Sequence, residues 1–315
     1  MHSLYFSKIE SLSENRIMKS YNILIVDDEE RVRRVLVDLL ELQGYSTRQA
    51  ENGYHALELI SQSIPDLVIS DIHMPDMDGF KLFGILDKSY PGVKQVLMTS
   101  YDVDKYISLI RKYNIGNILI KGAELNLNEV SRYLKSILTG DIFGLEKYFS
   151  GTEMKKVSLF RYSDAKRVSH EIVQEIPQKQ QTYLEVAIDE LVSNAFFHGV
   201  LQLTGIPREL WRDDYEIDPQ SAITVVWTRD SEKVGVAIED PKGNLKKIDV
   251  LKWLDSCRDE QLGLEHGRGL MLVRKLIDRM VINIDPGKRT ECIIIQYLDR
   301  DLNTNNNKPL MVHEL

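Results

Sequence analysis

The chain has 315 residues, of which 43% are hydrophobic and 28% are charged, and this length predicts two domains rather than one core. Its formal net charge of −8 and its pI near 5.5 disfavour a general nucleic-acid binder, which normally carries a basic face. No apolar run is long enough for a membrane span, and the N-terminus lacks a basic-then-apolar signal pattern. The two cysteines, Cys257 and Cys292, make no disulfide framework or metal cluster, which favours a cytoplasmic protein.

The first half of the chain alternates short apolar runs with amphipathic stretches. Residues 1–20 are polar and lack periodicity, so we expect a disordered extension before a domain over residues 21–140. Strands are expected at 22–28, 66–71, 94–100 and 117–122, and helices at 29–44, 79–89, 103–114 and 127–140. Continuous apolar strands that alternate with helices predict an α/β fold, a doubly wound five-stranded parallel sheet.

The second half has a different organisation. The pattern lapses over residues 141–152, which we interpret as a linker, and a second domain is expected over residues 153–300. Helices are predicted at 163–176, 181–199 and 267–280, and strands at 222–229, 233–240, 281–285 and 291–298. Because the strands cluster apart from the helices, this half predicts an α+β two-layer domain. The Asn-rich residues 301–315 are expected to form a disordered tail.

Polar side chains follow the predicted strands of the first domain. Asp27 and Asp28 end the strand at 22–28, Asp71 the strand at 66–71, Thr99 the strand at 94–100 and Lys121 the strand at 117–122. Three carboxylates at one sheet edge repel one another unless a cation joins them, and Mg²⁺ suits such a set. One carboxylate can then attack a phosphoryl donor and become an aspartyl phosphate. Lys121 would neutralise the transferred phosphoryl group, and the Thr99 hydroxyl would donate a hydrogen bond to it.

The motifs "ILIVDDE", "DLVISDIHMPDMDGF", "VLMTS" and "ILIK" span about 120 residues and resemble the receiver domain of two-component response regulators. The resemblance implies that Asp71 is the phosphoacceptor for an upstream histidine kinase. It also implies that Asp28, Asp71 and the backbone carbonyl of His73 bind Mg²⁺, with Asp27 in support.

Two positions depart from the receiver pattern. Gly122 follows Lys121 where the family usually has proline, and Ile118 stands three residues before the lysine, where the family usually has an aromatic residue. That aromatic side chain turns inward on phosphorylation in the family. We therefore expect the phosphorylation chemistry to be intact and the route by which the signal leaves the domain to differ.

The stretch "ELVSNAFFHG" at residues 190–199 places Glu190, Asn194 and His198 on one stripe of a predicted helix. Glu190 can act as a general base, and the Asn194 amide oxygen can bind a Mg²⁺ ion that bridges phosphates. His198 is expected to cap the end of this helix and not to take part in catalysis. His170, in "SHEIVQEIP", is interpreted as an exposed helix residue, because there is no room for a phosphoacceptor hairpin between it and Asn194.

Two further segments add groups that suit a nucleotide. Asp240 ends an apolar strand, where its carboxylate can accept a hydrogen bond from an exocyclic amine such as that of adenine, and Gly243 follows three residues later. In "HGRGLMLV", Gly267 and Gly269 open a helix, and glycines there leave backbone N–H groups free to approach a polyphosphate.

Together these segments resemble, over about residues 152–300, the GHKL-type ATP-binding fold that histidine kinases, gyrase and anti-sigma-factor serine kinases share, and they look most like the anti-sigma-factor branch. The resemblance implies ATP and Mg²⁺ as cofactors, an anti-sigma-factor antagonist, a sigma factor or both as protein partners, and a homodimer. No direct DNA binding is expected, because the chain offers no helix-turn-helix-like segment and no basic face. The implied nucleotide-site residues are Glu190, Asn194, Asp240, Gly243, Gly267, Arg268 and Gly269. The departure lies in the family's D-x-G-x-G segment, where Lys242 and Asn244 replace the two glycines.

We therefore interpret the chain as a response regulator that controls an ATP-dependent serine/threonine kinase. Phosphorylation of Asp71 would alter the helix or linker near residues 130–150 and so reposition or expose the kinase domain. Two alternatives stay open. The second domain can be a non-catalytic module that sequesters a sigma factor, an antagonist or a histidine kinase, or an ATPase domain that acts only on a cognate histidine kinase.

Overall fold

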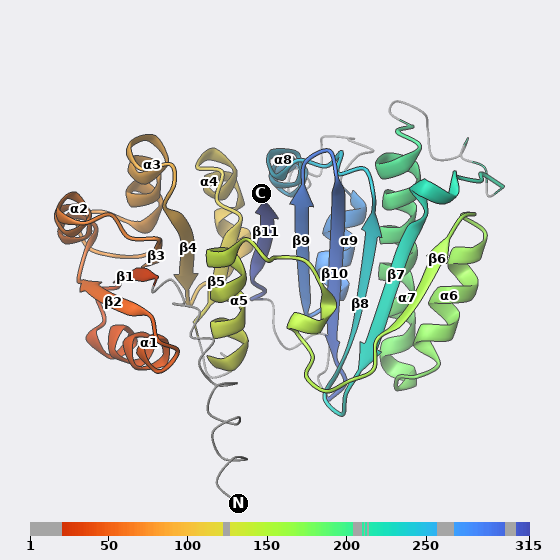
Figure 1. Ribbon diagram of the computed structural model, residues 1–315, viewed down its shortest axis with the longest axis horizontal. Coiled ribbons are helices and arrows are strands. Elements are labelled where there is room, and N and C mark those ends of the chain that lie inside the picture. The colour runs from red at the N-terminus through yellow and green to blue at the C-terminus, as the bar shows by residue number, and fades with distance from the viewer. Residues whose placement is uncertain are drawn as a thin grey trace, which may run out of the picture.

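In the computed structural model, residues 21–121, 127–203, 210, 212, 214–256, 268–299 and 307–315 are described. Within them, eleven strands form a single sheet in the order β2-β1-β3-β4-β5-β11-β9-β10-β8-β7-β6 (Figure 1). Both halves of the molecule therefore share one sheet. Among the helices of this described part, none is both long and apolar enough to span a bilayer.

The first half forms the expected doubly wound parallel sheet, β2-β1-β3-β4-β5. Its strands are β1 (Asn22–Val26), β2 (Ser46–Ala50), β3 (Leu67–Asp71), β4 (Lys94–Thr99) and β5 (Asn117–Ile120). Its helices are α1 (Glu30–Leu42), α2 (Gly53–Gln62), α3 (Gly79–Ser89), the 3₁₀ turn η2 (Val103–Tyr106), α4 (Ile107–Lys112) and α5 (Leu127–Thr139). The buried side chains of α1 and α5 pack on one face, and those of α2, α3 and α4 on the other.

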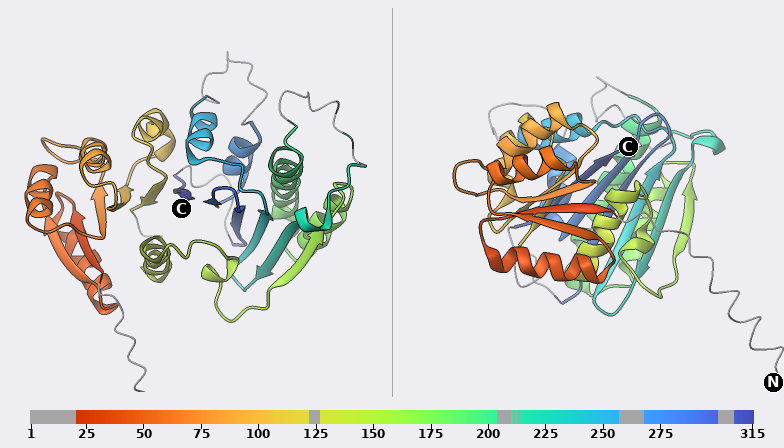
Figure 2. Two further views of the ribbon diagram at one scale, coloured as in Figure 1. Left: turned by 45° about the horizontal axis from the view of Figure 1, so that its top comes forward. Right: turned by 60° about the vertical axis from the view of Figure 1, so that its left-hand side comes forward.

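The second half is α+β, as predicted, with an antiparallel sheet covered on one face by helices (Figure 2). Its strands are β6 (Lys155–Leu159), β7 (Ile223–Arg229), β8 (Lys233–Asp240), β9 (Arg279–Asp285) and β10 (Arg289–Tyr297). Its helices are α6 (Asp164–Val173), α7 (Gln178–Ser193), the π-helix η4 (Asn194–Val200), the 3₁₀ turn η6 (Pro219–Ser221), α8 (Lys247–Ser256) and α9 (Arg268–Leu276). Helices α6, α7, η4, α8 and α9 lie on the same side of the sheet as α2, α3 and α4 and share one apolar core with them.

The prediction of a disordered tail over residues 301–315 is wrong for residues 310–314. Leu310–Glu314 form β11, which pairs antiparallel with β5 and parallel with β9 (Figure 1). Leu310, Met311 and Val312 are buried, so the strand is held by apolar burial as well as by backbone hydrogen bonds on both sides. This strand joins the two halves of the sheet. Residues 1–20, expected to be disordered, and 301–306 lie outside the described residues.

The segment predicted as a linker is packed against the second half of the sheet. It contains the 3₁₀ turn η3 (Leu145–Lys147), and it covers the face opposite to α6 and α7. The buried side chains of the segment are Ile142, Phe143, Leu145, Tyr148 and Phe149. Gly235 of β8 leaves the space for this contact, because a Cβ atom there would overlap the Phe149 ring.

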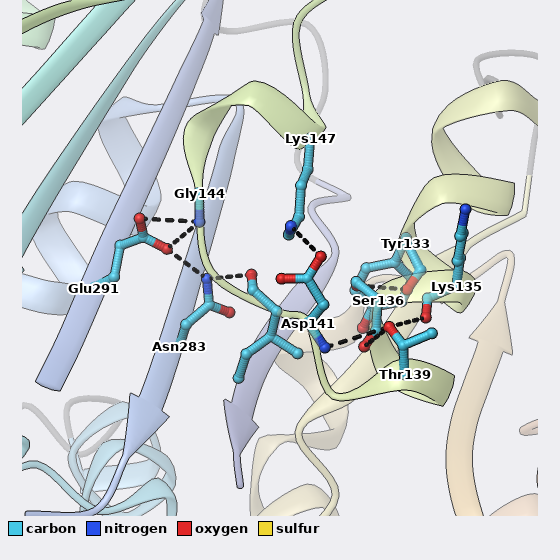
Figure 3. A network of polar contacts seen from close by, with 10 residues as sticks. Tyr133, Lys135, Ser136, Thr139, Asp141, Gly144, Lys147, Asn283 and Glu291 are labelled. Carbon is cyan, nitrogen blue, oxygen red and sulfur yellow. Dashed lines mark hydrogen bonds and ion pairs between the residues drawn. The ribbon is translucent and has the colours of Figure 1, made fainter. Parts of the chain in front are cut away.

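A polar network fixes the start of this segment (Figure 3). The buried Glu291 carboxylate accepts hydrogen bonds from the Gly144 N–H, at 3.0 and 3.1 Å, and from the Asn283 amide at 2.9 Å. The same amide nitrogen of Asn283 donates to the Ile142 carbonyl at 2.9 Å. The connection between the halves is therefore tied to β9 and β10 and does not act as a free tether.

Helix α5 is tied to the second half by a buried ion triad. One oxygen of Glu129 lies 2.5 Å from Lys233 Nζ of β8, and the other lies 2.7 Å from Arg279 Nη1 of β9. Burial alone would raise the pKa of Glu129, but Arg279 and Lys233 lower it overall. The carboxylate is therefore charged at neutral pH and matches its two cationic partners.

Candidate functional sites

Three of the predicted residues meet at the carboxyl edge of the first half of the sheet. Lys121 Nζ lies 2.6 Å from Asp27 Oδ2 and 2.7 Å from Asp71 Oδ1, and both carboxylates are buried. Burial raises the pKa of Asp27, and the hydrogen bond from Lys121 offsets only part of that rise. Burial alone would lower the pKa of Lys121, but its bonds to both aspartates raise it overall. The ammonium therefore holds two carboxylates close together.

Thr99 and His73 border the same site. The Thr99 hydroxyl lies fully buried at the end of β4 and accepts a hydrogen bond from the Tyr101 N–H at 3.0 Å. The His73 N–H donates to Asp71 Oδ2 at 3.0 Å. The loop after β3 and the loop after β4 are thus both tied to the residues predicted to carry the phosphoryl chemistry.

The donor groups at this edge are of the type that Mg²⁺ takes. Mg²⁺ needs only one or two carboxylates and keeps several waters, which suits Asp71 and Asp27 with the exposed Asp28 at the rim. Across the described residues, no three acidic, histidine or cysteine side chains are already gathered as a metal cluster. Lys121 is the cation that joins Asp27 and Asp71 in this state. The residues fit Mg²⁺ in chemical type.

The predicted stripe on "ELVSNAFFHG" does not continue as one α-helix. Helix α7 ends at Ser193, and Asn194–Val200 form a π-helix, in which the Leu201 N–H donates to the Phe196 carbonyl. The wider turn shifts His198 out of α-helical register with Glu190, which corrects the expected alignment. Phe196 and Phe197 are both buried beside Tyr162, with ring centroids 6.0 and 4.8 Å away, and a π-turn accommodates these adjacent aromatic residues.

Asp240 is buried at the end of β8, as the sequence places it. Its Oδ1 accepts hydrogen bonds from the N–H groups of Lys242, at 3.0 Å, and Gly243, at 3.2 Å. Burial raises its pKa despite these bonds. Gly243 has a φ of 60°, and a Cβ atom there would overlap the Asp285 carbonyl oxygen, so glycine is required. Asp240 is thus held in one orientation by the turn that follows it.

The π-helix lies directly against this turn. A Cβ atom on Gly199 would lie 3.0 Å from Asp240 Cγ, and the Asn244 amide donates to the Gly199 carbonyl at 2.9 Å. Lys242 and Asn244 replace the two expected glycines, and both residues are exposed. Neither therefore fills the space beside the buried Asp240. Lys242 is exposed, whereas Asn244 adds a hydrogen bond from the loop after β8 to the π-helix.

Glu190 lies against the first turn of α9. A Cβ atom on Gly269 would overlap Glu190 Oε1, so the carboxylate occupies the space that glycine leaves. Arg268 is the first residue of α9, and Gly267 lies outside the described residues. Helices α7 and α9 pack together, and η4 packs on β8. The structure therefore brings Glu190 to the start of α9, and Gly199 and Asn244 to Asp240.

The two candidate sites lie at opposite edges of the shared sheet. Strand β11 runs antiparallel to β5 but parallel to β9, and β8 has the same direction as β9 because both are antiparallel to β10. The carboxyl end of β3, with Asp71, therefore points away from the carboxyl end of β8, with Asp240. Any coupling between the two sites therefore has to act along the length of the strands, from one end of the sheet to the other.

Sequence reasoning missed the polar contacts between the halves. Asp255 of α8 accepts from Ser108 Oγ at 2.7 Å and from Arg111 Nη1 at 2.9 Å. Arg274 of α9 binds Asp104 of η2 at 2.8 Å. An arginine in the last turn of an amphipathic helix has the pattern of a solvated charge, so no signal in the sequence distinguishes this one.

Family models match two separate parts of the chain. Residues 23–129 match the model of the response regulator receiver domain, and residues 161–296 match that of the histidine kinase-like ATPase domain. The Sporulation initiation phosphotransferase F of Bacillus subtilis is 36% identical over 84 residues, which cover 27% of this chain and 68% of that protein. The Regulatory protein AtoC of Escherichia coli is 42% identical over 90 residues, 28% of this chain but only 20% of the relative's length.

Solved structures match the first half of the chain. The response regulator protein TrrA of Thermotoga maritima is 32% identical with a TM-score of 0.34, covering 37% of this chain and 98% of that one. The receiver domain of an HD domain-containing protein from Pseudomonas fluorescens is 29% identical with a TM-score of 0.37, covering 41% of this chain and 94% of that one.

Proposed function

This chain belongs to the response regulators, with a receiver domain followed by a histidine-kinase-like ATPase domain, and we propose that phosphorylation of Asp71 controls an ATP-dependent serine/threonine protein kinase in the second domain. The observation that carries the proposal is the contact between Glu190 and the first turn of α9. This contact supports the proposal because Glu190, the proposed general base, lies beside a helix start of the kind that can bind phosphates.

In the receiver, an oxygen of the Asp71 carboxylate would attack the phosphorus of the phosphoryl donor. A new O–P bond forms, the bond between phosphorus and the donor breaks, and Asp71 becomes an acyl phosphate. A receiver domain implies an upstream histidine kinase as the donor. Lys121 would shift from its present bridge between two carboxylates to the new phosphoryl oxygens. Mg²⁺, when bound near Asp71 and Asp28, would neutralise phosphoryl charge.

In the ATPase domain, the hydroxyl oxygen of a serine or threonine would attack the γ-phosphorus of ATP. The bond to the β-γ bridging oxygen breaks, ADP leaves, and Glu190 takes the hydroxyl proton. Asp240 would accept the adenine amine, and Asn194 would offer its amide oxygen to the Mg²⁺ that accompanies ATP. The proposed substrate is a small antagonist of an anti-sigma factor, and a sigma factor is the second proposed partner.

The alternative function is a non-catalytic binding module that is gated by Asp71. Its support is the segment "DPKGN", where the Asn244 amide bonds to the Gly199 carbonyl and joins the loop after β8 to the π-helix. A bond of this kind would restrain the nucleotide end of the domain. The exposure of Lys242 and the retention of Gly243 favour the catalytic proposal instead.

The deciding experiment measures Mg-ATP binding and phosphoryl transfer with the full chain. We expect Mg-ATP to raise the melting temperature of the wild type and not of Asn194→Ala. We expect Glu190→Gln to retain the shift but to transfer ³²P to antagonist proteins about 100-fold more slowly or worse. Lys242→Ala serves as control and should match the wild type. No shift in the wild type would sink the kinase and leave the binding module.

A further inference from the structure

Helix α9 connects the nucleotide end of the ATPase domain with the receiver. Its first turn holds Gly269 against Glu190, and its last turn holds Arg274 against the receiver. Nine helical residues span roughly 13 Å along the axis. Because a helix moves as a rigid body over such a length, a shift at Arg274 reaches Gly269.

Arg274 is 97% buried, and each of its polar contacts leads out of α9. Its Nε and Nη2 donate to Asp104 Oδ1 at 3.0 and 2.8 Å. Its Nη1 donates to the Pro309 carbonyl at 2.7 Å, and Nη2 also donates to the Lys308 carbonyl at 2.9 Å. Asp104 is the carboxylate that faces this guanidinium. A buried guanidinium that loses its carboxylate is strongly destabilised, so α9 has to follow Asp104 or release it.

Asp104 lies in η2, and a short series of contacts joins η2 to the phosphoacceptor. The His73 N–H donates to Asp71 Oδ2, and His73 Nε2 pairs with the Tyr106 hydroxyl at 2.9 Å. The His73 ring also packs edge-on against Tyr101, with 4.6 Å between the ring centroids. Tyr101 in turn donates its N–H to Thr99 Oγ1. The segment that carries Asp104 is therefore bonded on both sides to groups that touch the aspartyl phosphate site.

We propose that Arg274 is a positioning residue that couples the two sites: its ion pair with Asp104 transmits the state of Asp71, through His73 and Tyr106, to the position of α9 beside Glu190. Phosphorylation turns one carboxylate oxygen of Asp71 into the bridging oxygen of an acyl phosphate, which changes the acceptor beside the His73 N–H, and the added phosphoryl oxygens recruit the Thr99 hydroxyl. Both ends of the segment 99–106 then move, and Asp104 moves with them. This inference rests on the proposed function and names its regulation.

The test uses hydrogen–deuterium exchange of the full chain, with beryllium fluoride and Mg²⁺ as the probe for a phosphorylated Asp71. We expect the exchange rates of the α9 amides to change about fivefold or more when the probe is added, within the usual range of allosteric coupling. Asp104→Asn removes one charge from a partly exposed site and should reduce this change to below twofold. Tyr106→Phe should reduce it in the same way, because it removes only the hydroxyl that meets His73.

Asp255→Asn is the matched control. It removes the same charge from another receiver–ATPase contact, made with Ser108 and Arg111, and should keep the α9 response. An unchanged response in Asp104→Asn would overturn the proposal, as would loss of the response in Asp255→Asn. The proposal would also be overturned if, in the wild type, the probe slowed exchange around Asp71 but left the exchange rates of the α9 amides unchanged.

The nucleotide readout separates this inference from the proposed function. The affinity for Mg-ATP should change with the probe in the wild type, by about fivefold, and not in Asp104→Asn. A chain whose α9 responds to the probe but binds no Mg-ATP would contradict the kinase and support the coupling. A chain that binds Mg-ATP without any α9 response would support the nucleotide site and contradict the coupling.

Discussion

At the scale of single residues, Gly269 has a role that composition does not reveal. The space of its missing side chain is occupied by the end of the Glu190 side chain. Gly269→Ala should therefore displace a flexible carboxylate and leave the packing around it nearly intact. The gain in helix propensity, about 1 kcal/mol, offsets part of the cost. We expect a melting temperature close to that of the wild type and phosphoryl transfer reduced about 100-fold or more.

Three comparisons make this prediction specific. Gly92→Ala adds a methyl group where nothing lies within 4 Å and should leave transfer unchanged. Glu190→Gln should reduce transfer to the same degree as Gly269→Ala, and the double variant should lose no more than either, because both remove one function. A fully active Gly269→Ala would show that the carboxylate at this position takes no part in transfer.

At the scale of elements, α5 is joined to the ATPase sheet by the triad of Glu129, Lys233 and Arg279. Removing the carboxylate leaves the buried Lys233 and the partly buried Arg279 facing each other, which costs about 3–5 kcal/mol. We expect Glu129→Gln to lower the free energy of unfolding by this amount in urea titrations. Glu30→Gln breaks an exposed pair with Arg34 and should cost less than about 0.5 kcal/mol. Equal effects of the two variants would contradict a stabilising triad.

The elements also show how far the sequence leads. Regular apolar strands and amphipathic helices predict both domains, and strand-end residues such as Asp27, Asp71 and Lys121 meet as expected because parallel strands share one carboxyl edge. The π-helix was missed, since α-helical and π-helical turns differ by less than one residue and the periodicity of one turn cannot separate them. Strand β11 was missed because five residues after an Asn-rich stretch carry too short a pattern.

The contact between the two halves through Asp104 and Arg274 could not be predicted from the sequence either, and the reason differs from that for the π-helix and β11. The contact of Asp104 with Arg274 depends on the direction in which one half of the sheet runs relative to the other half, and that direction is set by β11. Ile118 of β5 stands where the receiver family usually has an aromatic residue. It is fully buried and pairs with Leu310 of β11. Ile118 thus lies where β5 meets β11, at the junction between the domains. The sequence pattern of the receiver domain alone cannot predict a contact with a strand from the other end of the chain.

At the scale of the whole molecule, the junction formed by β11 is expected to be sensitive to acid. His313 is buried in this strand, with its ring 5.3 Å from the Tyr133 ring, and burial together with the charge of Lys247 lowers its pKa to about 3. The folded chain therefore keeps His313 neutral, whereas the unfolded chain takes up a proton near pH 6.5. Stability contributed by the neutral ring is present above pH 6.5 and is lost progressively as the pH falls toward 3.

The size of the effect follows from the two pKa values. Between pH 7 and pH 5, the preferential protonation of the unfolded chain costs about 2 kcal/mol. Asp27, Asp240 and Glu291 have raised pKa values and act in the opposite direction, so the histidine has to be isolated by substitution. Between pH 7 and pH 5, we expect the free energy of unfolding of His313→Gln to fall by about 2 kcal/mol less than that of the wild type, as measured by urea titrations. If both proteins lost the same free energy of unfolding over this range, His313 would be accessible to protons in the folded chain and β11 would not shield it from solvent.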